Sequence, residues 1–412
     1  MPAVIKSQWH KKIILALLLL AAFSGAVLSH RARAAKRNFA DFHCFYTAGQ
    51  RMLRGADIYV VKDTEAAEFR YAPVIALVMA GLAITDEKTA DTIWYGFNFL
   101  LVLLIFSGLK KLILPQAGKR ETALVYFFCA LGGFRFILHN LDAGQTNLLM
   151  LACIVFGLYE SGRGREIRGA ALLAFSAMLK YTPLIFVPYF LARKRTKLAL
   201  ATCAWAGIFL LLPAVFIGFG KNLYYLNGLL PQLFQSSILE KLTLIHGKNQ
   251  SLFSAIYRLF TPCVEYFHAP HMPFERWQIS PQAIISIYLF FAGLLYLTIL
   301  YLPKKARKNP VFCLYDYAML LICVALFNLN AWKPSFVMLL AGFFLLSAQL
   351  IRQGFQDRIT LGGLVTCYIL NIITLNSLLG RGLAARLYYY SPLTISALIC
   401  FFLLLCLRNK PT

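Results

Sequence analysis

The stretch DFHCFYTAGQRMLRGADIYVVKDTEAAEFRYAP, residues 41–73, decides how the rest of this chain is interpreted. This insert is polar and rich in charge, and it stands between apolar runs whose lengths suit a lipid bilayer. Its first residue, Asp41, comes shortly after the first of those runs. A carboxylate next to lipid is costly unless it is hydrated, paired or functional. We therefore interpret Asp41 as a functional group at a membrane surface, with the apolar remainder of the chain as its scaffold.

The composition around this insert is that of a polytopic membrane protein. Of the 412 residues, 59% are hydrophobic and only 14% are charged, and the mean hydropathy is +0.66. The net charge of +24 comes from short Lys and Arg clusters between apolar runs, where such clusters set topology and contact anionic headgroups. We therefore expect membrane lipid, and no nucleic acid, as a partner. The 10 cysteines show no metal-ligand spacing, so we expect no metal and no cofactor.

Counting apolar runs predicts an all-α polytopic protein with about 12 transmembrane helices, in which residues 1–412 form a single integral membrane domain. Residues 11–29 with ARAA at 32–35 resemble a signal peptide and its cleavage site, but the basic cluster of Arg31, Arg33, Lys36 and Arg37 favours an uncleaved first span. The apolar run at 72–83 is too short to cross the bilayer and is expected to lie along the outer interface. The short runs at 169–180 and 183–192 form a Pro-broken pair that must be buried among neighbours.

The basic clusters between the later apolar runs predict the orientation of the chain. If these clusters are cytoplasmic, the alternate loops are extracytoplasmic, including a first loop at 30–91 and a second large loop at 219–280. Polar side chains then gather on the outer face. Those singled out as candidates are Asp41, Tyr46, Arg70, Asp142, Gln145, Asn147, Lys180, His246, Lys248, Asn249, Gln250 and Arg258.

Four blocks of sequence resemble the signature of glycosyltransferase family 87. They are DFHCFYTAGQRMLRGADIY with FRYAPVIALVMAGLAI, then GQTNLLM at 144–150, LKYTPLIFVPYFLARKR at 179–195 and KNQSLFSAIYRLF at 248–260. They stand in the family's order and cover residues 41–260, with Ala72 where the family pattern has Pro. The resemblance implies a GT-C fold and an activity like that of polyprenol-phosphate-mannose-dependent mannosyltransferases.

The resemblance also implies a role for Asp41. In GT-C enzymes an Asp of the first outer loop acts as the base on an acceptor hydroxyl, which attacks a polyprenyl-phosphate sugar with inversion and expels polyprenyl phosphate. A carboxylate can do this within hydrogen-bonding reach of the hydroxyl, and partial desolvation raises its pKa usefully. The alternative is a helix-end salt bridge with Arg37 or Arg51. The implied partners are a polyprenyl-phosphate hexose donor, with mannose favoured, and a lipid-linked or envelope glycan acceptor outside the plasma (inner) membrane.

A departing phosphate needs fixed cations and hydrogen-bond donors. The candidates for the donor phosphate are, in falling order, Lys180, Lys248, Arg258 and Arg70, followed by His246, which could also bind the acceptor sugar. Each has a structural alternative. Lys180 could snorkel or pair with Asp142, while Arg258 could anchor a helix at the interface and Arg70 could contact headgroups.

The remaining candidates would bind the acceptor or the sugar. Gln145 and Asn147 are predicted hydrogen-bonding partners of sugar or backbone, and Tyr46, Asn249 and Gln250 are grouped with them. Asp142 either orients the acceptor or an ion, or neutralises Lys180 when the site is empty. The competing function is a polytopic transporter or flippase of lipid-linked glycans, and a non-catalytic scaffold is a third possibility. The gathering of polar residues on one face favours the transferase.

Overall fold

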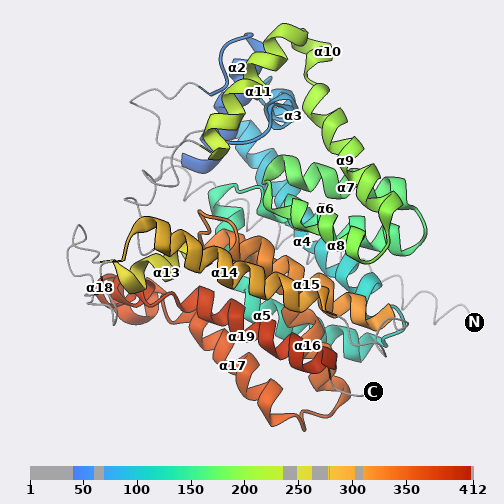
Figure 1. Ribbon diagram of the computed structural model, residues 1–412, viewed down its shortest axis with the longest axis vertical. Coiled ribbons are helices and arrows are strands. Elements are labelled where there is room, and N and C mark those ends of the chain that lie inside the picture. Colours follow the sequence, from blue (N-terminus) through green and yellow to red (C-terminus); the bar gives the residue numbers. More distant parts are fainter. Residues whose placement is uncertain are drawn as a thin grey trace, which may run out of the picture.

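The computed structural model describes residues 40–59, 69–234, 248–261, 277, 279–301 and 310–409. These residues form helices joined by short loops, and no strand occurs among them (Figure 1). The predicted all-α class is therefore confirmed. The first predicted span, at 11–29, and the candidate His246 lie outside the described residues. The single-domain division of the chain stays a prediction.

Six of the described helical segments are long and apolar enough to cross a membrane. They are α4 (Glu87–Ile113), α5 (Lys119–Ala143), α9 with α10 (Thr196–Ile217), α14 (Pro281–Leu300), η4 with α16 (Lys333–Arg352) and α19 (Pro392–Asn409). Shorter apolar segments are α3 (Pro73–Leu82), α6 (Asn147–Gly162), η1 with α8 (Thr182–Ala192), α15 (Pro310–Leu326) and α17 (Arg358–Ile372). The other helices are α2 (Ala40–Leu53), α7 (Glu166–Leu179), α11 (Phe219–Phe234), α13 (Leu252–Phe260) and α18 (Asn376–Tyr389).

The Pro-broken pair expected near 169–192 is present. α7 ends at Leu179, and the chain continues through η1 (Thr182–Ile185) into α8 (Phe186–Ala192). Pro183 explains the break, because it has no N–H to continue the helix and its ring would clash with the carbonyl of Leu179, four residues earlier. α7 packs closely on α6, since a Cβ atom at Gly169 would lie only 2.6 Å from the carbonyl oxygen of Gly157. Small residues allow such close approach between membrane helices. The expected burial therefore holds for most of α7, whereas η1 and α8 leave Leu184 and Leu191 exposed.

The ends of the helices gather into two polar groups. The Asp41 end holds the start of α2, the end of α5, the starts of α6 and η4, and the end of α7. The Asp316 end holds the ends of α8, α14 and α19 and the start of α15. In Figure 1, α13 and α18 lie at the left and α19 runs from there towards the C-terminus at the right. Successive helices such as α14, α15 and α16 thus run in alternating directions between the two groups, as the predicted up-and-down path of the chain requires. Which group faces the outside of the membrane stays a prediction.

The Asp316 end is a closed ionic cluster. The Asp316 carboxylate, 1% exposed, receives Arg408 Nη1 at 2.7 Å and Arg193 Nη2 at 2.8 Å. Tyr189 donates its hydroxyl to the same carboxylate at 2.9 Å. Both arginines also donate to carbonyls at the end of α14, where the helix dipole favours positive charge. Although their sequence clusters suggested headgroup contacts, these two arginines therefore fasten four helices together.

Candidate active site

Asp41 lies in the first turn of α2, where the positive end of the helix dipole favours a carboxylate. Its neighbour Phe42 packs against the turn after α5, at Gly144, and stacks on Trp94 at 6.5 Å. Trp94 Nε1 in turn donates to the Gly144 carbonyl at 2.7 Å. Gly144 has φ +65°, and a Cβ there would lie 2.8 Å from Phe42. Glycine at this position therefore lets the start of α2 sit directly on the turn that carries Gln145.

Two further side chains from distant blocks face Asp41. Gln145 makes a side-chain hydrogen bond to Asp41, and Lys180 lies close enough to favour the ionised carboxylate. Burial nevertheless outweighs both and raises the pKa of Asp41 above its ordinary value. A carboxylate with a raised pKa is a stronger base once ionised. The structure thus brings together three residues that the sequence analysis selected from three separate blocks.

Lys180 stands in the loop just beyond α7, with extended backbone. Its ammonium donates to Asn147 Oδ1 at 2.7 Å and to Ser335 Oγ at 3.4 Å. Burial lowers the pKa of Lys180 to about 8, and Asp41 opposes that shift. The carboxylate that acts on the pKa of Lys180 is Asp41, rather than the alternative partner Asp142. Asp142 itself lies partly buried near the end of α5.

Tyr71 completes this group and was missed by the sequence analysis. Its hydroxyl lies near Thr146, and the charges of Asp41 and Arg70 both act on it. Burial raises the pKa of Tyr71, so the phenol stays neutral. The ring packs edge-on against Phe45 of α2 at 4.8 Å. The signal for Tyr71 was available in the block FRYAP, where it precedes the Ala-Pro that opens α3.

Three other candidates form a hydrogen-bonded junction at α13. Asn249 and Gln250 donate their side-chain amides to the carbonyls of Leu329 and Tyr388, each at 2.8 Å. Arg258 is fully buried. It donates to the carbonyls of Asn249 and Tyr389 and to the hydroxyls of Ser254 and Ser391. These bonds join α13 to the loop before η4 and to α18, so the side chains of Asn249, Gln250 and Arg258 already bind protein atoms.

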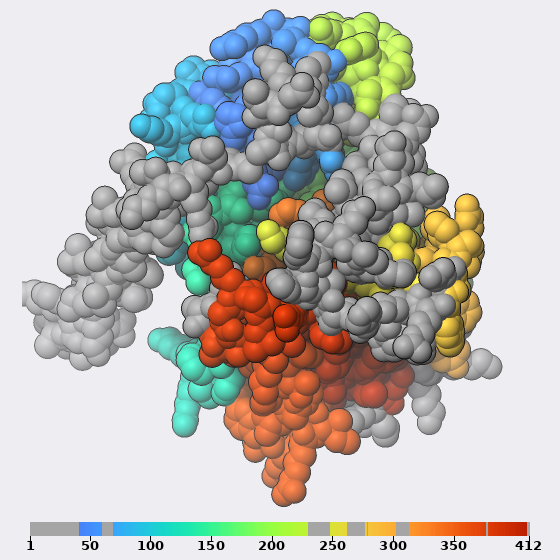
Figure 2. Space-filling view, turned by 90° about the vertical axis from the view of Figure 1, so that its left-hand side faces the viewer, coloured from blue at the N-terminus to red at the C-terminus, as the bar shows by residue number. Residues whose placement is uncertain are grey.

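The last three described candidates differ in exposure, and Arg70 is partly buried. Tyr46 is buried, donates its hydroxyl to the Thr85 carbonyl at 2.8 Å and accepts from Gln50 at 3.1 Å, which fastens α2 to the turn before α4. Lys248 is exposed at the start of the block 248–260. In Figure 2, α2 (blue), α13 (yellow) and α18 (orange-red) all reach the same face of the molecule. The candidates that converge on Asp41 are therefore Gln145, Lys180 and, through Lys180, Asn147.

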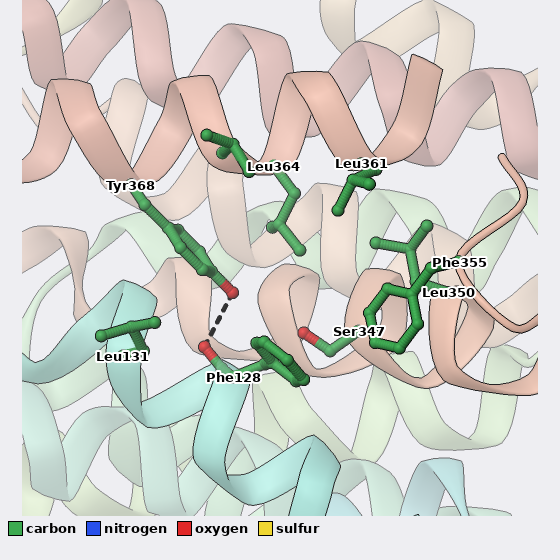
Figure 3. A pocket seen from close by; sticks show the side chains of 9 residues that line it. Phe128, Leu131, Ser347, Leu350, Phe355, Leu361, Leu364 and Tyr368 are labelled. Carbon is green, nitrogen blue, oxygen red and sulfur yellow. Dashed lines mark hydrogen bonds between the residues drawn. The ribbon is translucent and has the colours of Figure 1, made fainter. Parts of the chain in front are cut away.

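An apolar cavity elsewhere does not belong to this group. It has a volume of about 130 Å³ and lies between α5, α16 and α17, lined mainly by Phe and Leu side chains (Figure 3). Tyr368 crosses it and donates its hydroxyl to the Phe128 carbonyl at 2.7 Å. None of its lining residues is charged or was predicted as a site residue. Among the described residues there is also no group of three or more His, Cys, Asp or Glu side chains that could hold a metal ion.

These observations define an all-helical membrane protein with a carboxylate and an ammonium brought together at one end of its helices. The model of glycosyltransferase family 87 matches residues 69–328, more than half of the chain, and the chain therefore belongs to that family. The match includes Gln145, Asn147 and Lys180 but begins after Asp41. The resemblance seen in the four blocks is thus confirmed.

Outside its family, the chain has only a distant similarity to a protein of known structure. Among solved structures, the chain is similar to ArnT from Cupriavidus metallidurans bound to undecaprenyl phosphate, with 11% identity and a TM-score of 0.38. That similarity covers 93% of this chain and 76% of ArnT, and it is a distant one. No curated protein matches the sequence.

Proposed function

We propose that this glycosyltransferase moves a hexose, with mannose favoured, from a polyprenyl-phosphate donor to a lipid-linked or envelope glycan at the extracytoplasmic face of the plasma membrane. The observation that carries the proposal is the meeting of Asp41, Gln145 and Lys180 at one end of the helices. A base and a cation in a partly desolvated site are what this reaction requires.

Asp41 is the proposed base. Its ionised carboxylate takes the proton from the acceptor hydroxyl while that oxygen forms a bond to the anomeric carbon. The bond between the anomeric carbon and the phosphate oxygen breaks, and polyprenyl phosphate leaves with the electron pair. A single displacement of this kind inverts the anomeric configuration. Gln145 is proposed to orient the carboxylate, since it makes a side-chain hydrogen bond to it.

Lys180 is the proposed cation for the leaving phosphate. An ammonium has three N–H bonds, and two of those on Lys180 point to Asn147 and Ser335. The third can reach a substrate oxygen. Electrostatic stabilisation of developing charge is strongest where water is scarce, and Lys180 is partly buried. Arg70, Lys248 and His246 stay proposed as further donor contacts, and Asp142 as a contact to the acceptor.

The test uses purified full-length protein, a radiolabelled polyprenyl-phosphate-mannose and a membrane lipid extract as acceptor. Asp41→Asn is expected to lose transfer while keeping a monodisperse folded peak. The matched control is Asp57→Asn, because Asp57 lies just past the end of α2 and accepts from the Tyr224 hydroxyl at 2.7 Å, a bond that asparagine can also accept. The control is expected to retain transfer.

Two outcomes would overturn the proposal. Equal transfer by Asp41→Asn and the wild type would remove Asp41 as the base. A wild-type protein that transfers nothing, yet moves the labelled lipid across a liposome bilayer, would replace the transferase by the transporter.

A further inference from the structure

Two buried asparagines behind Lys180 form a directional relay. We propose that Asn140 and Asn147 are positioning residues that hold the Lys180 ammonium at the donor phosphate without neutralising it. This inference rests on the proposed function and deepens it. It also assigns Asn147, first taken as a sugar contact, to the lysine instead.

The relay consists of four hydrogen bonds, two of which start from the same nitrogen of Asn140. Asn140 Nδ2 donates to the carbonyls of Phe136 at 2.8 Å and of Pro334 at 2.9 Å. Asn147 Nδ2 donates to Asn140 Oδ1 at 3.0 Å, and Lys180 Nζ donates to Asn147 Oδ1 at 2.7 Å. Both asparagines are almost completely buried. The relay therefore runs from the backbone of α5 and η4 to the ammonium.

The direction of the relay follows from its first two bonds. A carbonyl oxygen can only accept, so two carbonyls next to Asn140 require its NH₂ group on that side. Its Oδ1 must then face Asn147, which has to present its own NH₂ group. Asn147 is left with Oδ1 towards Lys180. Amide orientation is thereby set by backbone geometry rather than by the lysine, and the acceptor is in place before substrate arrives.

A second path fixes the same ammonium. Ser335, whose Oγ lies 3.4 Å from Lys180 Nζ, directly follows Pro334, whose carbonyl holds Asn140. The relay and this serine thus close a ring through η4, and the amine is held from two sides. Such preorganisation matters because a misplaced cation loses much of its effect on a transition state.

The two asparagines of the relay carry no charge, and this leaves the positive charge of Lys180 available to the donor phosphate. The titratable group that acts on Lys180 is Asp41, across the site, and the two asparagines add no charge. An aspartate at position 147 would form an ion pair with the ammonium and compete with the phosphate for it. An amide accepts from the ammonium while leaving its full charge for the substrate.

The first test measures the titration midpoint of Lys180 itself, by pH-dependent acetylation of the purified full-length protein and mass spectrometry. We expect Asn147→Leu and Asn140→Leu to lower the midpoint by about one pH unit, because the charged form loses its acceptor. Asn147→Asp should raise it, because a carboxylate favours the charged amine. A merely structural role would not move the midpoint in opposite directions.

The matched control is Asn98→Leu. Asn98 is also fully buried, but its side-chain amide donates to the Trp94 carbonyl at 2.9 Å within α4 and not to Lys180 or its partners. In the Asn98→Leu variant, the titration midpoint of Lys180 is expected to equal that in the wild type. All variants are first compared by melting temperature and elution profile. An unchanged midpoint in folded Asn140→Leu and Asn147→Leu would overturn the relay.

The second test uses the transfer assay. The three relay variants should raise the donor KM by about tenfold, whereas Asn98→Leu should not. A shifted midpoint with an unchanged donor KM and kcat would show that the relay has no part in the reaction and would overturn the positioning role. If the wild type has no transferase activity, the proposed function fails, but the acetylation midpoints still decide whether the relay holds Lys180.

Discussion

Asp41 and Asp316 are two carboxylates that differ in their exposure and in the number of protein groups that bind them. Asp316 is 1% exposed, and two guanidinium groups and a phenol hydroxyl bind its two oxygens. Asp41 is partly exposed and makes a side-chain hydrogen bond with Gln145. The charge of Lys180 acts on it only through electrostatic attraction. Protein groups saturate Asp316, so it can only hold helices together. Asp41 retains room for a substrate hydroxyl, and burial raises its pKa.

The contrast extends to the cations. Arg193 and Arg408 face Asp316 at hydrogen-bonding distance and cap the end of α14. Lys180 instead bonds to the neutral groups of Asn147 and Ser335. Arginine cannot lose its proton in a protein, whereas burial lowers the pKa of Lys180 to about 8. The two ends thus separate a structural ion cluster from a site whose charges stay available.

The largest expected effect is on catalysis at the Asp41 end. Asp41→Asn should lower transfer by about 10²–10⁴-fold, the usual range for loss of a general base. Its melting temperature should not fall. Because the folded pKa of this acid is raised, the ionised carboxylate costs folding free energy at neutral pH, and a neutral amide removes that cost. Parallel activity and thermal melts of the two proteins check this, and a markedly lower melting temperature would contradict it.

The Asp316 end should respond in the opposite way. Asp316→Asn leaves two buried guanidinium groups without their carboxylate, which is expected to cost about 3–5 kcal/mol of stability. Thermal unfolding in detergent would measure the loss. Any fall in transfer should follow the folded fraction only. A variant as stable as the wild type would show that the cluster does not carry this stability.

Lys180→Met should lower transfer by about 10²-fold, the scale of one lost electrostatic contact to developing charge. Methionine keeps the unbranched shape of the side chain and removes the charge. Steady-state kinetics on the donor would measure the effect, with Lys248→Met as the exposed comparison. An equal or larger loss in Lys248→Met would make Lys248, rather than Lys180, the main cation for the phosphate.

The smallest effect is expected from the turn that supports Asp41. Gly144→Ala should reduce transfer by about tenfold, because its Cβ would press on Phe42 at 2.8 Å and displace the start of α2. Gly55→Ala is the matched control, since Gly55 also has positive φ but no atom within 4 Å of its Cβ position. Both should lose about 1 kcal/mol from backbone strain. Equal activity in the two variants would separate this turn from catalysis.

Sequence patterns predicted the helical class, the Pro-broken pair and the short run before α4, because each depends on local composition and spacing. They also selected Asp41, Gln145 and Lys180, which the fold brings together from three blocks. Tyr71 was missed because a tyrosine near a predicted interface has an ordinary anchoring explanation.

Side-chain partners far apart in the chain could not be predicted. Lys180 meets Ser335 across 155 positions, and Arg408 meets Asp316 across 92. Arg258 illustrates the same limit. Its place in an outer loop suggested a phosphate contact, but it donates to the Tyr389 carbonyl of α18 and to the Ser254 hydroxyl of α13. Only the packing of the helices determines which polar groups remain open to a substrate.

The most direct test of the account is the pH dependence of transfer by the wild type and by Lys180→Arg. The wild type should rise from acid pH through the raised pKa of Asp41 and fall again near pH 8, as Lys180 loses its proton. In Lys180→Arg the overall rate should be lower, but the alkaline fall should disappear, because a guanidinium stays charged to about pH 12 and above. An alkaline limb that is the same in both proteins would contradict the assignment of Lys180 as the cation of the site.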